Sequence, residues 1–250
     1  MAKRAVSPAP DAPSRTLIER AYAQLRDDIV SGRLPPDEKL RVEHLKDRYG
    51  VGAGTLREAI TRLASDALVV TEGQRGFRVA PIAIADLQDL TRLRIHIEID
   101  ALRQSLRHGD AAWKARLQAA YTELSRLEQP LQAGHARSWD AMNTAFHEAL
   151  LSGHDSPWTV RLLRTLARQG ERYRRYAINL PESRRDVHAE HREIFGSAMA
   201  GNDLRAALAL EAHIQATADL VTQALQARSD LNENSIELSP MLRQQLSNKE

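Results

Sequence analysis

The sequence predicts a mostly α-helical protein in two parts. A small N-terminal unit of three helices and a β-hairpin is followed by an antiparallel bundle of six to seven helices. Apolar residues recur at three- and four-residue steps through most of the chain, which is typical of amphipathic helices. Only residues 68–79 change to short β-rich runs around a Gly-containing turn. The length of 250 residues and the 42% hydrophobic content suit one large domain or two small ones.

The first predicted unit spans residues 16–80 and follows an arm at residues 1–15 that is rich in Pro, Ala and Ser and expected to be flexible. Gly32 and the prolines after it end the first helix. The expected elements are helices at Leu17–Val30, Val42–Tyr49 and Thr55–Ser65 and strands at Leu68–Val70 and Phe77–Val79. Helix, short helix, turn, helix and hairpin is the order of a winged helix-turn-helix.

This geometry predicts a docking surface for duplex DNA, with the third helix in the major groove. Arg57 is the leading candidate because helical spacing leaves it off the apolar face, and Arg75 at the wing tip is expected to enter the minor groove. For each other cation, a solvated surface charge is an equally good interpretation. The predicted DNA-binding residues are Arg41, Lys46, Arg48, Thr55, Arg57, Arg62, Gln74, Arg75 and Gly76.

The second predicted unit, residues 84–228, reads as helices throughout. Asp110, Ser156 and Asn202 stand where N-caps are expected, and Pro157 follows Ser156 at a first helical position. Residues 229–250 are expected to form a polar tail that frays. The expected helices are Ile84–Arg107, Asp110–Gln129, Ser138–Ser152, Ser156–Asn179, Ser183–Ala200 and Asp203–Ala227.

Three histidines of the second unit, His147, His191 and His213, lie on three different expected helices. Asn143 precedes His147 by four residues and therefore shares its helix face. Imidazoles brought together from separate helices can hold a divalent metal such as zinc. The alternative interpretation is that each is an ordinary surface or hydrogen-bonded histidine. That interpretation is preferred for four histidines near turns, His44, His108, His135 and His154.

Motifs in both units resemble those of one family of regulators. TLREAITRLASDALVV and GQRGFRVAP resemble the recognition helix and wing of the GntR-type winged helix. NTAFHEALLSG, AEHREIFGSAMAGND and EAHIQA resemble the ligand-bearing segments of the FCD effector domain found in the FadR subgroup. The resemblance implies a transcriptional regulator, usually a repressor, that binds a palindromic DNA operator as a homodimer.

The resemblance also implies a metal site. It places Asn143, His147, His191 and His213 on the family's metal-binding positions, with zinc as the expected ion and nickel as the other candidate. The family usually has Asp where this chain has Asn143, and a neutral amide oxygen is a weaker ligand than a carboxylate. A polar pocket that binds an organic acid without metal is the alternative.

The effector implied by the resemblance is a small carboxylic acid. Arg94 matches a family arginine on the first bundle helix, where it either binds a carboxylate or simply pairs with Glu98, four residues on. Arg172 and Tyr173 are further candidate effector-binding residues, and a solvated helix face is the alternative for them. The DNA-binding half is also similar to a glutarate-responsive repressor of the family, which makes a dicarboxylate such as glutarate a candidate effector.

One departure from the family's motifs concerns DNA binding. Gly52-Ala53-Gly54 replaces a common Ser-Arg-Thr, so the family's target preference is not transferred.

Composition narrows the classes of protein to which the chain can belong. The absence of cysteine excludes disulfide and thiolate chemistry, and no apolar run approaches the roughly 18 residues of a membrane span. Without a signal peptide, a cytoplasmic protein with no membrane partner is expected. Two rivals remain: a metal-dependent hydrolase using His147, His191 and His213, and an architectural DNA binder with an inert bundle. No general base is convincingly placed, so the prediction is a regulator and not an enzyme.

Overall fold

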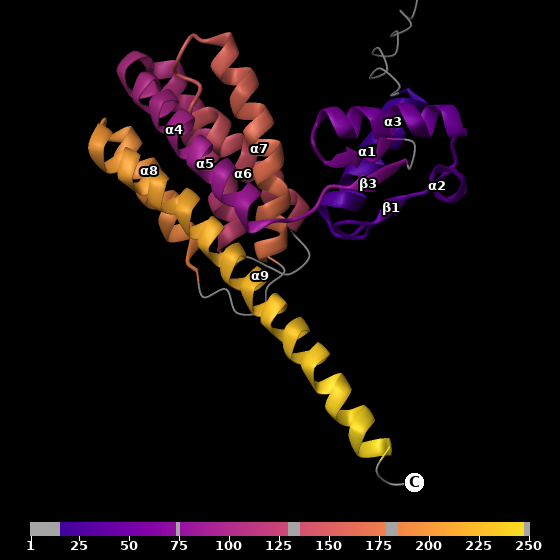
Figure 1. Cartoon of the computed structure of the whole chain (residues 1–250). Coiled ribbons are helices and arrows are strands. Elements are labelled where there is room, and N and C mark those ends of the chain that lie inside the picture. The colour runs from indigo at the N-terminus through magenta and orange to yellow at the C-terminus, as the bar shows by residue number, and fades with distance from the viewer. Residues whose placement is uncertain (1–15, 74–75, 130–135, 179–184, 248–250) are drawn as a thin grey trace, which may run out of the picture. The chain divides into compact units, whose positions relative to one another are not determined.

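The computed structural model describes residues 16–73, 76–129, 136–178 and 185–247. The chain divides into two compact units, with the boundary between Pro81 and Ile82, and the predicted mostly α fold is confirmed (Figure 1). Within the described ranges, no helix is both long and apolar enough to cross a membrane. The arm predicted at residues 1–15 and the wing-tip residues Gln74 and Arg75 lie outside the described residues.

The first unit has the predicted helices and hairpin, together with one additional strand. Its elements are α1 (Leu17–Val30), β1 (Lys39–Leu40), α2 (Val42–Tyr49), α3 (Ala53–Ser65), β2 (Val69–Thr71) and β3 (Phe77–Val79). The sheet order is β1-β3-β2, and both pairings are antiparallel, with Leu40 opposite Phe77 and Val69 opposite Val79. The two residues of β1 are too few to show a strand period, which explains why the sequence did not predict it.

The apolar faces of α1 and α3 form the core of this unit. Leu25, Leu56, Ile60 and Leu63 have no exposed surface, as their three- and four-residue spacing predicts. Helix α3 begins two residues before the predicted start, with Gly52 as its N-cap. Gly52-Ala53-Gly54 therefore forms the beginning of the recognition helix and not a separate loop.

The second unit is a helical bundle, and its described residues form α4 (Ile84–His108), α5 (Ala111–Glu128), α6 (Ala136–Leu150), α7 (Pro157–Ile178), α8 (Val187–Met199) and α9 (Asp203–Ser247). Trp113, Leu117, Phe146 and Leu210 lie in one buried cluster at its centre. Asp110 caps α5 as predicted, since its side chain accepts a hydrogen bond from the backbone N–H of Trp113 at 2.7 Å.

The prediction of a polar tail that frays at residues 229–250 is wrong, because α9 continues through most of this segment, to Ser247. Its C-terminal half, yellow in Figure 1, extends beyond the other helices of this unit. The polar composition of residues 229–250 is the reason that the prediction was wrong. A helix that has already been nucleated by packing can be extended by polar residues, since each residue other than Pro240 adds a backbone hydrogen bond to it.

Asp28 at the end of α1 joins three segments of the first unit. It is 8% exposed and accepts hydrogen bonds from Arg33 Nε at 2.7 Å, Arg48 Nη2 at 2.8 Å and the Tyr49 hydroxyl at 2.6 Å. Burial acts to raise the pKa of Asp28, but the hydrogen bonds from Tyr49 and Arg33 and the charges of Arg33 and Arg48 lower it overall. The charged carboxylate therefore holds α2 against the end of α1.

We expect Asp28→Asn to lower the free energy of unfolding at pH 7 by about 1–3 kcal/mol, because charge-assisted hydrogen bonds are lost. Since the native pKa of Asp28 is depressed, its contribution is complete above about pH 4 and disappears as the pH falls through the native value. Urea unfolding followed by circular dichroism should show a difference from the wild type that shrinks in acid. Asp47→Asn, on the exposed side of α2, is the control. An equal difference at pH 7 and pH 3 would contradict this account.

Candidate functional site

The predicted DNA-binding cations differ in whether they already form ion pairs within the protein. Arg57 is exposed on α3 and has no ion pair among the described residues. Arg62 pairs with Glu58 on the same helix at 3.2 Å. Arg48 is held by Asp28 and has a structural role in this unit. Of the other predicted contacts, Arg41 is exposed, Thr55 is half-buried, Lys46 pairs with Glu43 at 2.9 Å, and Gly76 ends the turn with a φ of +97°.

The second unit brings His147 on α6, His191 on α8 and His213 on α9 together in the bundle interior. One ring nitrogen from each lies within 4.8 Å of the others, and the ring centroids are 4.7–5.7 Å apart. His191 is fully buried, and His213 is 5% exposed. The three histidines that the sequence named as candidates for one site thus lie close together.

The electrostatics of this cluster leave nitrogen lone pairs available. Burial lowers the pKa of His147 and of His213 well below the usual value, and the neighbouring histidines add to the effect. Both rings are therefore neutral at pH 7. Nδ1 of His191 lies 2.8 Å from Glu128 Oε1, and Nδ1 of His213 lies 2.7 Å from Glu190 Oε2.

Several buried polar atoms around the cluster have no hydrogen-bond partner among the described residues: Asn143 Oδ1, His147 Nδ1 and His191 Nε2. Asn143 is 1% exposed and lies one helical turn before His147. Unpaired polar atoms in a protein interior are costly unless an ion or ligand satisfies them. Three nitrogens and an amide oxygen suit a divalent cation such as zinc.

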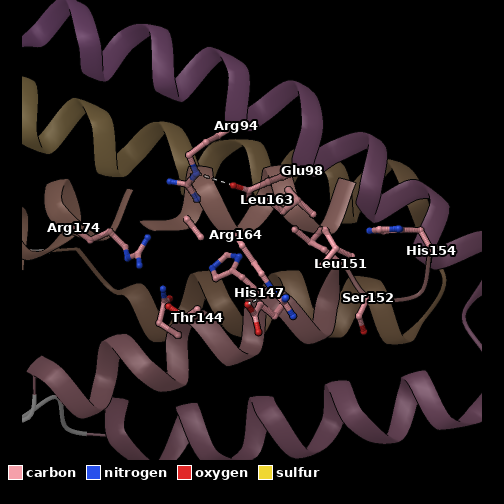
Figure 2. Close-up of a pocket in the computed structure, with 14 residues that line it drawn as sticks. Arg94, Glu98, Thr144, His147, Leu151, Ser152, His154, Leu163, Arg164 and Arg174 are labelled. Carbon is pink, nitrogen blue, oxygen red and sulfur yellow. Dashed lines mark hydrogen bonds and ion pairs between the residues drawn. The ribbon is translucent and has the colours of Figure 1, made fainter. Parts of the chain in front are cut away.

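A cavity of about 240 Å³ lies next to the histidines, between α4, α6 and α7. His147 and Asn143 border it, and Leu151, Val160 and Leu163 contribute apolar wall. Figure 2 shows Arg94, Arg174 and Thr144 around one end of this cavity and Ser152 and His154 toward the other. An apolar cavity with a few converging polar groups is the usual form of a small-molecule site.

Two arginines converge on the backbone of α7 at Gly170. A Cβ atom at this position would lie 2.9 Å from Arg94 Nη1 and 3.2 Å from Arg174 Nη1, so glycine leaves the space that both guanidinium groups occupy. Arg94 Nε donates to Glu98 Oε1 at 2.7 Å, whereas Arg174 is 8% exposed and its Nε has no hydrogen bond in the described chain. Burial lowers the pKa of Arg174. Like charges this close favour an anion between them.

The two other predicted effector contacts, Arg172 and Tyr173, do not line this cavity. The Tyr173 hydroxyl instead donates to Asp86 at 2.7 Å. Arg174 takes the place that the sequence analysis gave to its neighbours, because Val160, Ala167 and Arg174 recur at seven-residue steps on one face of α7. That spacing was visible in the sequence and could have identified Arg174.

His154 is a second cavity residue that the sequence analysis missed. Its Nδ1 accepts a hydrogen bond from the backbone N–H of Ser156 at 3.1 Å, which leaves the proton of the neutral ring on Nε2. Nε2 is buried and has no partner among the described residues. His154 therefore presents a hydrogen-bond donor to the cavity, although it lies in a turn, where the sequence offers no periodic signal.

Two family descriptions match the chain. Residues 17–79 match the family described as bacterial regulatory proteins, gntR family, and residues 89–216 match the FCD domain. These ranges correspond to the winged helix and to most of the bundle that holds the histidines.

Characterised and uncharacterised relatives agree with these matches. A protein of Paraburkholderia xenovorans strain LB400, described as an uncharacterized HTH-type transcriptional regulator, BphR, is 42% identical over 220 residues, covering 87% of this chain and 90% of its own. The HTH-type transcriptional repressor GlaR of Escherichia coli K12 is 30% identical over 209 residues, covering 82% and 95%.

Two solved structures share the fold. E. coli McbR/YncC superposes with a TM-score of 0.68 at 17% identity, covering 85% of this chain and all of that one. A putative transcriptional regulator GntR from Rhodococcus sp. RHA1 gives a TM-score of 0.67 at 22% identity, covering 83% and 98%. The order of winged helix and helical bundle is thus common to these proteins.

Proposed function

The chain belongs to the GntR family of DNA-binding transcriptional regulators, with an FCD domain, and on that premise we propose that it is an acid-responsive repressor. Its bundle holds a divalent metal, a small carboxylic acid binds beside that metal, and the acid changes operator affinity. The observation that carries this proposal is the meeting of three clustered imidazoles in the bundle with a cavity that two arginines border.

The DNA half of the proposal rests on the winged helix. A homodimer would place two copies of α3 in successive major grooves of a palindromic operator, about one helical turn apart. Arg57 supports this, since it is exposed on α3 and has no ion pair within the described ranges that would compete with a base or phosphate. A regulator of chromosomal operators would work in the bacterial cytoplasm.

The metal half rests on the chemistry of the donors. His147, His191 and His213 would hold zinc, with nickel as the second candidate, and Asn143 would contribute its amide oxygen. When bound, a divalent cation would supply the positive charge that a carboxylate neutralises. The amide of Asn143 adds no charge, so the acid's own carboxylate is the anion best suited to complete the site.

The remaining cavity wall supports an acid with an apolar body. Arg94 and Arg174 are the anchors proposed for its anionic end, and the Nε2–H of His154 is a donor at the other end. Glutarate, proposed from the sequence resemblance, is the first acid to test. Binding would favour a bundle arrangement that misaligns the two winged helices, and such coupling is typically worth ~1–3 kcal/mol.

The families and relatives that match the chain are transcriptional regulators, so it is a regulator and not an enzyme. The hydrolase considered from the sequence has no support among them. The histidine cluster therefore serves ligand recognition in this proposal.

We expect Arg57→Ala to weaken operator binding by about tenfold to a hundredfold, because a good base contact is worth ~1–3 kcal/mol. Fluorescence anisotropy on a duplex selected from random sequence measures this Kd. Arg20→Ala removes the same charge from an exposed position on α1 and should change the Kd much less. Equal affinities for wild type and Arg57→Ala would remove this residue from the interface.

The double variant His147→Ala with His191→Ala tests the switch. It should bind the operator like the wild type but lose the response to acid, because the site that couples acid to DNA is gone. Gel shifts with and without glutarate and other mono- and dicarboxylic acids, in the presence of zinc, provide the readout. If no acid that binds the wild-type bundle changes its DNA affinity, the proposed switch is wrong.

Asn143→Asp should tighten zinc binding by roughly tenfold or more, because an added carboxylate charge near a divalent cation is worth more than ~1.4 kcal/mol even at a high effective dielectric constant. Competition with a chromogenic chelator gives the Kd. Asn202→Asp makes the same chemical change at the exposed N-cap of α9 and should have no effect. An unchanged Kd in Asn143→Asp would show that residue 143 is not a ligand.

A further inference from the structure

Two carboxylates, those of Glu128 and Glu190, contact the histidine cluster. We propose that Glu128 and Glu190 are positioning residues that fix which nitrogen of His191 and of His213 is offered to the metal, a role that rests on the proposed metal site. Neither glutamate borders the cavity.

Glu128 is the last residue of α5, and its side chain is only 2% exposed. Its Oε1 lies 2.8 Å from His191 Nδ1 and accepts a hydrogen bond from Trp139 Nε1 at 2.9 Å, while Oε2 lies 3.3 Å from His188 Nδ1. A carboxylate can only accept, so this contact selects the tautomer of His191 that carries its proton on Nδ1. The lone pair is then on Nε2, the atom that has no hydrogen-bond partner in the described chain.

Glu190 gives His213 the same support from α8. His213 Nδ1 lies 2.7 Å from Glu190 Oε2, and Arg185 donates to both oxygens of Glu190, at 2.6 and 2.5 Å. Arg185 also donates to the His213 carbonyl oxygen at 2.8 Å and to Thr217 Oγ1 at 2.6 Å, so it ties the start of α8 to α9. Its Nη2 is 3.2 Å from His213 Nδ1, but the shorter contact to Glu190 determines the position of the proton.

The third histidine has a different environment. Nδ1 of His147 has no hydrogen-bond partner among the described residues, and His147 is the member of the cluster that borders the cavity. The cluster thus combines two imidazoles with fixed tautomers and one without such support. In metal sites, a histidine whose second N–H is held by a carboxylate is fixed in orientation and is a more basic ligand.

The test measures zinc affinity of the full chain by chelator competition. Glu128→Gln and Glu190→Gln keep the side-chain shape but remove the charge, and the amide N–H₂ can turn toward Nδ1 and reverse the tautomer. Each should weaken zinc binding roughly 10- to 100-fold. The matched control is Glu193→Gln, which lies on α8 with Glu190 and pairs with Arg205 near the surface. This variant should leave the Kd for zinc unchanged.

The outcomes separate the two proposals. If the wild type binds zinc and His191→Ala does not, but both glutamine variants bind like the wild type, the positioning role is wrong and the metal site stands. If the wild type does not bind zinc, the metal site is wrong, and the positioning role is wrong with it.

A second measurement does not depend on whether the variants fold. Long-range ¹H–¹⁵N correlation spectra of the zinc-free wild type, labelled at histidine, report the tautomer of each ring. His191 and His213 should both carry the proton on Nδ1. A proton on Nε2 of either ring would overturn the proposal for that residue.

Discussion

The bundle depends on how it accommodates polar groups in its own interior. Three imidazoles from three helices meet in the bundle interior, beside the aromatic rings of Phe146 and Trp139. Polar groups in such surroundings are costly unless each finds a partner. Glu128 and Glu190 satisfy one nitrogen of His191 and one of His213, and the nitrogens left over face one another. In the proposed metal site, the cost of leaving these nitrogens unpaired would contribute to the affinity for an ion.

The cavity also borders buried charged groups whose desolvation is costly. Arg94 and Arg174 share the space above Gly170, and their charges are only partly balanced by Glu98 and by Asp140, which lies 3.6 Å from Arg174. Burial raises the pKa of Asp140 and lowers that of Arg174, so both groups lose stability in their charged forms. An incoming carboxylate would relieve this strain. The affinity for an acid that we propose would thus follow from charges that folding has brought together at a cost.

Local patterns predicted much of the fold because they reflect contacts within a few residues. The faces of α1 and α3, the cap at Asp110 and the shared face of Asn143 and His147 all follow from helical spacing. Long-range contacts were less accessible. Glu128 lies 63 residues from His191, and nothing near it in the sequence marks it as a partner. Arg174 is the exception, since it shares a helix face with Val160 and Ala167 at seven-residue steps, a pattern present in the sequence.

The sequence by itself determined the fold class, the winged helix with Arg57 on its outer face, and the three histidines as candidates for one site. It could do so because helical periodicity and family motifs are properties of short segments. Only the tertiary structure decided which arginine borders the cavity, which histidine nitrogens remain available, and that α9 continues to Ser247. These depend on groups that are distant in sequence and adjacent in space, so no local pattern encodes them.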